Sequence, residues 1–415
     1  MEKWIECKIS DIGTVVGGAT PSTKKPENYE NGDIAWITPK DLSSFSGRYI
    51  QRGERNITEI GLKSCSTQLL PKNTVLFSSR APIGYVAIAE NAVCTNQGFK
   101  SVIPNEDTDP IFLYYLLKYN KDKIESMGSG TTFKEVSRNT MKNIVVSVPQ
   151  DKQVQEKIAS VLDAIDEKIE ENERINNNLE QQAQLLFKSW FVDFEPFNGT
   201  MPSDWEVVPF EKIVDFQNGY AFKSKELLNE PSSDCYQVFK QGHIARGGGF
   251  IPDGTKSWYP KKLASKLERF VLKKGDILMA MTDMKNNVAI LGNTAIMPID
   301  NEYIVNQRVG HLRVNGYKGI TYPFIYLLTN STDFLIDLRS RANSGVQVNL
   351  SSAEIKASQT VLPSEKVNTA FSEITFPMFE AIISNQLENQ RLAQLRDTLL
   401  PKLMSGELDV SDIDL

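Results

Sequence analysis

The residues of this 415-residue chain that could carry out chemistry are few and dispersed. Its two histidines, His243 and His311, stand in unlike contexts without a carboxylate cluster around them. Its four cysteines form no C-x-x-C pair. Zinc sites and disulfide frameworks need closely spaced ligands or paired cysteines, and this sequence has neither. We therefore expect no metal site and no cofactor.

Motifs for phosphate binding and methyl transfer are also missing. The nearest string to a P-loop, residues 249–256, misplaces the lysine that the motif requires. No N-P-P-[FY] or D-P-P-[FY] string is present, and no G-x-G-x-x-G string opens a helix after a strand. Asp253 together with Asp283 and Lys285 loosely resembles a nuclease carboxylate set, but such strings arise often by chance. The sequence predicts a non-enzyme.

Side chains that could contact nucleic acid are more frequent in this sequence than side chains that could hold a metal or carry out catalysis. Base edges are read by Arg, Lys, Asn, Gln, Ser and Thr, whereas Lys and Arg contact phosphates. The candidate DNA-binding residues in the first half are Thr38, Lys40, Arg48, Arg52, Arg55, Ser79, Arg80, Thr131, Thr132 and Lys134. Those in the second half are His243, Arg246, Thr282, Lys285, Ser344 and Gln347. The alternative for each is an ordinary surface side chain with no ligand.

These candidates lie in two copies of one repeat of about 200 residues. Trp4-Ile5-Glu6 is echoed by Trp205-Glu206-Val207, and from Ser137 and Ser351 onward the two copies stay 214 positions apart. Arg80 and Thr282 occupy the same place in this repeat. A difference there would help the two halves read different bases.

Each copy begins with a mixed α/β segment. In the first copy we expect strands over 75–78, 85–89 and 144–148 and a helix over 111–121. Residues 150–191 then contain no Pro and no Gly, and their apolar residues follow a heptad pattern. The second copy repeats this pattern. The expected fold class is α+β, with two similar domains joined by two long helices that form an antiparallel coiled coil. The expected divisions are 1–150, 151–197, 198–363 and 364–415.

Three details of the helices carry further expectations. Asn172 and Asn176 in the first helix and Gln386 and Gln390 in the second interrupt the apolar seam, where buried amides would fix the register; the alternative is that this stretch faces solvent or another protein. Pro377 predicts a kink or a late start of the second helix. The candidate partner-binding residues, for which burial in the chain's own core is the alternative, are Trp190, Phe191 and Phe194.

The distribution of charge separates domains from helices. The whole chain carries a net charge of −6. Residues 1–150 and 198–363 carry +2 and +3, whereas 151–197 and 364–415 carry −6 and −5. The acidic helices would repel phosphate and suit a protein partner. No apolar run is long enough for a membrane span, and the first residues do not follow a signal-peptide pattern, so we expect a cytoplasmic protein.

Two strings identify a family. Residues 183–197, AQLLFKSWFVDFEPF, and residues 399–408, LLPKLMSGEL, are similar to the conserved regions of the specificity (S) subunit of type I restriction-modification enzymes. The order domain, helix, domain, helix also resembles this family over essentially the full length. The resemblance implies two target recognition domains that each read half of a bipartite, asymmetric double-stranded DNA site. It also implies that separate modification (methyltransferase) and restriction (endonuclease) subunits carry out the chemistry.

Helix length would then set the unread spacer between half-sites, and the two similar halves would offer docking faces to two modification subunits. Two other classes stay open. A coiled-coil scaffold that joins two protein-binding domains would show no DNA affinity, and a stand-alone transcriptional regulator would need a helix-turn-helix, zinc-finger or effector domain that is not evident.

Overall fold

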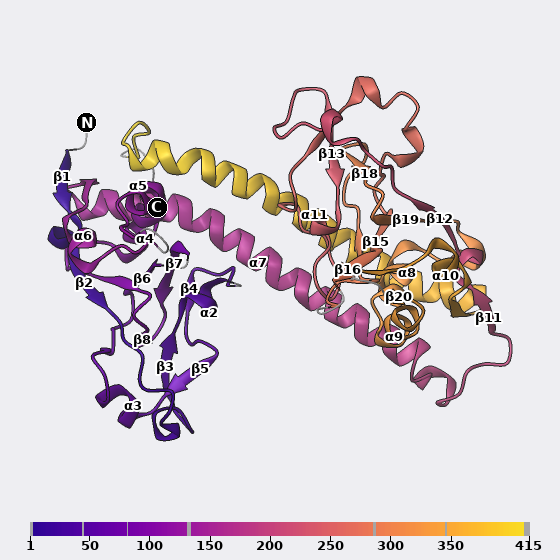
Figure 1. The fold of residues 1–415 in the computed structure, drawn as a ribbon, viewed down its shortest axis with the longest axis horizontal. Coiled ribbons are helices and arrows are strands. Elements are labelled where there is room, and N and C mark those ends of the chain that lie inside the picture. The colour runs from indigo at the N-terminus through magenta and orange to yellow at the C-terminus, as the bar shows by residue number, and fades with distance from the viewer. Residues whose placement is uncertain are drawn as a thin grey trace. The chain divides into compact units, whose positions relative to one another are not determined.

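The computed structural model describes residues 3–43, 45–80, 82–130, 134–284, 288–344 and 347–410 (Figure 1). The chain divides into two compact units. Unit 1 comprises Met1–Glu171 and Glu388–Leu415, and unit 2 comprises Asn172–Leu387. Each unit therefore contains one globular domain together with parts of both long helices.

The domain of unit 1 is built on three small sheets. An antiparallel pair joins β1 (Trp4–Lys8) to β10 (Val145–Pro149). A five-stranded sheet has the order β2 (Gly13–Gly17), β9 (Lys100–Pro104), β6 (Val75–Ser79), β7 (Ile83–Ala89), β4 (Tyr49–Ile50). A three-stranded sheet has the order β5 (Arg55–Ile57), β3 (Ile34–Ile37), β8 (Cys94–Thr95). The helices are α1 (Ile9–Ile12), α2 (Pro39–Ser43), α3 (Glu59–Lys63), α4 (Pro110–Tyr119), α5 (Lys121–Ser126) and α6 (Arg138–Asn143).

Local sequence explains the central elements of this domain. All five residues of β6 are buried, and its first three, residues 75–77, are apolar, which fits a strand in the middle of a sheet. Helix α4 begins where the Asp109 carboxylate accepts hydrogen bonds from two backbone amides and Pro110 occupies the first turn. The strands expected over 75–78, 85–89 and 144–148 and the helix expected from residue 111 are confirmed, each within a few residues at its ends.

Unit 2 repeats this plan. Strand β11 (Glu206–Pro209) pairs with β22 (Gln359–Leu362), and a four-stranded sheet has the order β12 (Val214–Asn218), β19 (Val309–Val314), β15 (Ile277–Ala280), β17 (Thr294–Ile296). The third sheet has the order β14 (Trp258–Pro260), β13 (Cys235–Phe239), β18 (Tyr303–Val305). The helices are α8 (Tyr322–Thr329), α9 (Thr332–Ser340) and α10 (Ser352–Ala357). The shared strand order confirms the internal duplication.

Unit 2 also contains a three-stranded sheet, and at the matching place the described residues of unit 1 form isolated bridges. It is formed by β16 (Thr282–Met284), β21 (Gln347–Asn349) and β20 (Asn343–Ser344), in that order. The sheet follows directly after β15 and directly precedes α10.

The long helices are α7 (Lys152–Phe191) and α11 (Glu365–Met404), each of 40 residues (Figure 1). In unit 1 the Asn389 amide donates a 3.2 Å hydrogen bond to the backbone carbonyl of Ile169, and Arg396 donates one of 2.6 Å to Asp166. The later residue of α11 thus contacts the earlier residue of α7, so the two helices run in opposite directions. The predicted antiparallel pairing is confirmed.

The polar part of the seam differs in one respect from the prediction. Asn172 is buried, and in unit 2 Asn176 accepts a 2.9 Å hydrogen bond from Asn385. The amides of α11 that hydrogen-bond to α7 are therefore Asn385 and Asn389, one position before the predicted Gln386 and Gln390. Gln390 is exposed. A shift of one residue rotates a helix face by about 100°, which the heptad pattern alone did not resolve.

Pro377 lies in the interior of α11, so the predicted late start of this helix is wrong. Phe371 and Phe379, on either side of the proline, are both buried in the core of unit 2. Packing of this apolar face holds the helix across a residue that cannot donate a backbone hydrogen bond.

Each domain completes its hydrophobic core with side chains from both long helices. In unit 1, Ile158 and Leu162 of α7 and Leu403 of α11 join the core that contains α4. In unit 2, Phe187 of α7 and Phe371 of α11 join the core that contains α8. In the described part of the chain, no helix has the length and apolar character that crossing a membrane requires.

Candidate nucleic-acid interface

Buried and partly buried hydrogen bonds fix each domain to the long helices. In unit 1, the Tyr115 hydroxyl of α4 donates a 2.8 Å hydrogen bond to Asp166 of α7. Burial, reinforced by the Asp166 carboxylate, raises the pKa of Tyr115 far above its ordinary value. In unit 2, Tyr326 donates to Glu180 of α7 at 2.7 Å and Tyr322 donates to Glu380 of α11 at 2.8 Å. The domains are therefore held by directed polar contacts as well as by apolar packing.

Arg48 belongs to this attachment and not to a DNA surface. Its side chain is only 4% exposed. Its Nε and one terminal nitrogen donate to the two carboxylate oxygens of Glu170 at 2.9 and 3.0 Å, and the guanidinium also pairs with Asp163. Two acidic residues of α7 hold this arginine, so the prediction that it contacts DNA is wrong.

Ser79 and His243 are also buried and are removed from the DNA-binding candidates. Ser79, fully buried in β6, donates a hydrogen bond to the carbonyl of Gly98 and accepts one from Lys100, each at 3.1 Å. His243 is fully buried, accepts a 3.1 Å hydrogen bond from the backbone amide of Lys240 and stacks on Phe250. Burial lowers the pKa of His243. Both side chains stabilise their domains.

The end of β6 forms a polar edge in unit 1, which we call edge 1: Arg80, Lys100, Ser129, Lys134 and Glu135. Ser129 and Glu135 exchange backbone hydrogen bonds of 3.0 and 2.9 Å, and Glu135 also forms a β-bridge with Arg80. The Glu135 carboxylate lies 3.1 Å from the ammonium of Lys100 and 3.7 Å from the guanidinium of Arg80. Arg80 remains 37% exposed and Lys134 is exposed. Edge 1 therefore presents two cations to solvent.

The corresponding edge in unit 2, edge 2, is the sheet β16–β21–β20. It brings together three predicted residues, since Thr282 pairs with Asn349, Met284 pairs with Gln347, and Ser344 ends the adjacent strand. The two edges occupy equivalent positions. The amide of Leu350 bonds to the carbonyl of Met281 at 2.9 Å, as the amide of Val136 bonds to that of Ser79 at 3.0 Å in unit 1.

Asp283, in β16, has a structural role at edge 2. One of its carboxylate oxygens accepts backbone hydrogen bonds from Ala289, Ile290 and Leu291 at 2.7, 2.7 and 3.2 Å. Burial alone would raise the pKa of Asp283, but these hydrogen bonds outweigh it and hold the pKa below its ordinary value. The carboxylate thus holds the backbone of residues 289–291 close to β16.

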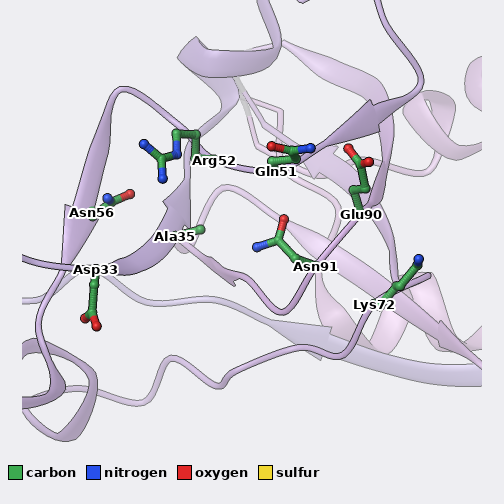
Figure 2. Close-up of a pocket in the computed structure, with 8 residues that line it drawn as sticks. All are labelled: Asp33, Ala35, Gln51, Arg52, Asn56, Lys72, Glu90 and Asn91. Atoms are coloured by element: carbon green, nitrogen blue, oxygen red, sulfur yellow. The ribbon is translucent and has the colours of Figure 1, made fainter.

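A polar hollow of about 400 Å³ lies elsewhere on the domain of unit 1 (Figure 2). It is lined by Asp33, Ala35, Gln51, Arg52, Asn56, Lys72, Glu90 and Asn91. The Asn56 side-chain oxygen is buried and has no hydrogen-bond partner among the described residues. The hollow lies toward the start of β6 and the end of β7, whereas Arg80 follows the other end of β6. Arg52 and Arg80 are therefore at opposite ends of the domain's main sheet.

The sequence predicted only Arg52 in this hollow. Gln51 is its neighbour, but Asn56, Lys72 and Asn91 come from separate segments that only the folded chain brings together. The carboxylates of the hollow offset its two cations, so it is a poor phosphate site. Its amides suit base edges better.

The other candidates have individual surroundings. Thr38 donates a 2.6 Å hydrogen bond to Asp41, and the ammonium of Lys40 lies 2.6 Å from Glu54 at the surface. The exposed guanidinium of Arg55 lies 4.2 Å from the centre of the Tyr29 ring, and Arg246 is exposed in a glycine-rich loop. The candidates outside the described residues are Thr131, Thr132 and Lys285, together with the side chain of Ser344.

The aromatic residues at the end of α7 pack inside unit 2. Phe191 is buried, with its ring centre 4.8 Å from that of Phe371. Trp190 packs at 5.7 Å from Phe371, and Phe194 at 5.9 Å from Trp205. For Phe191 the prediction of a partner contact is wrong, and the alternative of core packing holds. Trp190 and Phe194 are half-buried in the same cluster.

A different surface near the end of α7 is available to a partner. Leu185 and Val192 are 68% and 39% exposed. Two adjoining hollows of about 380 and about 220 Å³ share Phe187, Val192 and Asp333 in their walls. We call this surface the α7 exit surface. The heptad pattern did not single out Leu185 or Val192, so the sequence alone did not identify it.

The chain contains two copies of one α+β domain. Each copy has a polar edge at an equivalent position, and each is fixed to the paired long helices. This arrangement defines a two-domain recognition protein. A family model for the type I restriction modification DNA specificity domain matches residues 1–181 and 202–396. The chain belongs to this family, as the two sequence strings predicted, and its members are the non-catalytic specificity subunits of type I restriction-modification systems.

Individual relatives agree. The MjaIX specificity subunit of Methanocaldococcus jannaschii is 35% identical over 99% of this chain and 94% of that protein. The HindI specificity subunit of Haemophilus influenzae is 25% identical over 98% of this chain and 100% of that protein. The crystal structure of the S subunit from M. genitalium shares the fold, with a TM-score of 0.61 over 97% of this chain and 96% of that one at 19% identity.

Proposed function

We propose that this chain selects the DNA sequence for a type I restriction-modification complex by reading a bipartite, asymmetric site, one half with each domain. The observation that carries the proposal is the pair of equivalent edges with different side chains, Arg80 and Glu135 on edge 1 against Thr282 and Asn349 on edge 2. Equivalent positions suit one mode of approach to DNA, and unlike side chains suit two different half-sites.

The fixed attachment of each domain to α7 and α11 supports a set spacing between half-sites. Tyr115 and Arg48 bind the domain of unit 1, called domain 1, to α7. Tyr326 and Tyr322 bind the domain of unit 2, called domain 2, to α7 and α11. A domain held by buried and partly buried directed bonds keeps its orientation on its helix better than one on a flexible linker. In the proposal, the length of the helices determines the number of base pairs that are not read.

Two modification subunits and, through them, restriction subunits are the proposed protein partners. The helical segments carry −6 and −5, which opposes phosphate binding and favours contact with protein. The α7 exit surface offers exposed Val192, which lines two hollows, and exposed Leu185, seven residues earlier, in α7. Exposed apolar side chains next to concave walls suit the buried core of a protein interface.

Methylation-sensitive sequencing of host DNA with and without this gene tests the proposal. We expect loss of the gene to abolish methylation of one split adenine motif. Retention of every methylated motif would contradict it. Absence of any DNA affinity in the assembled complex would instead support the scaffold alternative.

A further inference from the structure

Edges 1 and 2 differ at three matching positions. The register of the main sheets places Lys100 of β9 where β19 has Gly310, because Val102 pairs with Val75 as Leu312 pairs with Ile277. Arg80 and Glu135 correspond in the same way to Thr282 and Asn349, which are paired across β16 and β21. Edge 1 thus carries three charged side chains at positions where edge 2 has none.

Glu135 is held from beneath by a buried cation. Lys100 is 8% exposed, and its ammonium lies 3.1 Å from both the Ser79 hydroxyl and the Glu135 carboxylate. A lysine this deep in a sheet is costly unless its charge is paired, so the contact with Lys100 holds the Glu135 carboxylate in place. The same carboxylate lies 3.7 Å from Arg80, beyond ordinary hydrogen-bond distance. Arg80 is therefore oriented by Glu135 while its donors remain available.

Edge 2 is built without charge at these positions. A side chain at Gly310 would come within 2.7 Å of the Phe216 ring, so a lysine beneath this edge would require that ring to move. Thr282 donates a 2.8 Å hydrogen bond to Gln241, and Asn349 is exposed. The charged arrangement is a property of domain 1 and not of the shared fold.

We propose that Arg80 contacts a guanine in the half-site of domain 1, with Glu135 and Lys100 as the residues that position it. This inference rests on the proposed function and assigns a base and a residue to it. The guanidinium fork matches the two acceptors that guanine presents in the major groove, which no other base pair reproduces. The fixed Glu135 carboxylate limits rotation of the Arg80 guanidinium and weakens the attraction of that guanidinium for phosphate. Contact with DNA is therefore favoured where a guanine supplies both acceptors.

The test uses the complete complex with its modification subunits and duplexes in which each half-site position is varied through all four bases. For Arg80→Gln we expect about 10- to 100-fold weaker binding to the motif that the complex methylates. The preference for guanine over other bases should be lost at one position of one half-site. The other half-site should be read as before. Arg80→Lys keeps the charge and can still donate to guanine but loses the planar fork, so it should retain only part of this discrimination.

Lys134 supplies a matched control because it is an exposed cation on the same edge. Lys134→Ala should weaken binding to all duplexes by the same factor and reduce the salt dependence, with every base preference intact. Glu135→Gln should lower discrimination at the guanine position while binding to unrelated DNA stays the same or becomes tighter. A purely structural role for Glu135 would not produce that combination.

The outcomes separate the two proposals. If the wild-type complex methylates a split motif and Arg80→Gln retains full guanine discrimination, the assignment of Arg80 is overturned and the proposed function stands. If the wild-type complex recognises no split motif, the proposed function itself fails. Thermal unfolding of Arg80→Gln should match wild type, because the side chain is 37% exposed.

Discussion

The Tyr115 hydroxyl lies 2.8 Å from the carboxylate of Asp166, and Arg396 approaches the other carboxylate oxygen of the same aspartate at 2.6 Å. One buried aspartate of α7 therefore joins helix α4 of the domain to α11 in unit 1. Asp166 is 5% exposed, so the two donors replace the water that an ionised carboxylate would otherwise require.

Removal of the Tyr115 hydroxyl should weaken this junction. We expect Tyr115→Phe to lower the free energy of unfolding by about 1–3 kcal/mol, because a buried charged acceptor loses one of its donors. Urea denaturation measures the effect. Tyr119→Phe, at a 41% exposed position of the same helix, is the control and should change stability little. Equal losses for the two variants would contradict the role given to Tyr115.

Arg48 and Arg52 should behave differently despite being close in sequence. Arg48→Ala should cost about 2–3 kcal/mol of stability, less than a fully buried pair, because its carboxylate partners are partly solvated. Arg52→Ala should leave stability within about 0.5 kcal/mol, since Arg52 is exposed beside the hollow. Thermal unfolding distinguishes them, and a stable Arg48→Ala protein with altered sequence preference would restore Arg48 as a DNA contact.

Stability of unit 2 should depend on pH through Asp276. Burial acts to raise the pKa of this carboxyl, but His311 and Arg313 outweigh it and lower the pKa below its ordinary value of 3.8. The unfolded chain then binds the proton more readily. The stabilisation is present above the ordinary value and is lost as pH falls from there through the lower folded pKa.

Asp276→Asn should therefore flatten the loss of stability in acid, as measured by urea midpoints across a pH series. Asp204, which is exposed, provides the control: Asp204→Asn should keep the wild-type slope. An unchanged slope in Asp276→Asn would show that this carboxyl does not carry the effect.

Helix length should determine the spacer of the recognised site. Seven residues inserted into both α7 and α11, near residues 172 and 388, preserve the heptad seam and lengthen each helix by about 10 Å. We expect both half-sites to stay the same and the spacer to grow by about three base pairs. Methylation mapping of the variant gives the result directly. An unchanged spacer would exclude the helices as its determinant.

Leu185 should matter for assembly and not for folding. Leu185→Glu places a charge at a 68% exposed apolar site, so we expect little change in stability and at least tenfold weaker association with the modification subunit. Leu263→Glu, at a 48% exposed position in the domain of unit 2, is the control. Quantitative co-purification is the measurement. Wild-type association of Leu185→Glu would remove the α7 exit surface from consideration.

The sequence by itself determined the duplication, the family and the long helices, because these depend on repeat spacing, local strings and apolar periodicity. It also placed the strand of residues 75–79 and the start of α4 at Asp109 within a few residues. Each of these features is encoded by residues that are neighbours along the chain.

Only the tertiary structure decided which polar residues remain accessible. Arg48, Ser79 and His243 have the side chains of DNA contacts, yet each is buried. Arg48 is held by Glu170, Ser79 bonds to Gly98, and the His243 ring packs against that of Tyr303 as well as nearby Phe250. The hollow of Arg52 and the pairing of Thr282 with Asn349 likewise join separate segments. Burial and pairing depend on contacts across the fold, so residue type and local spacing could propose candidates but could not choose among them.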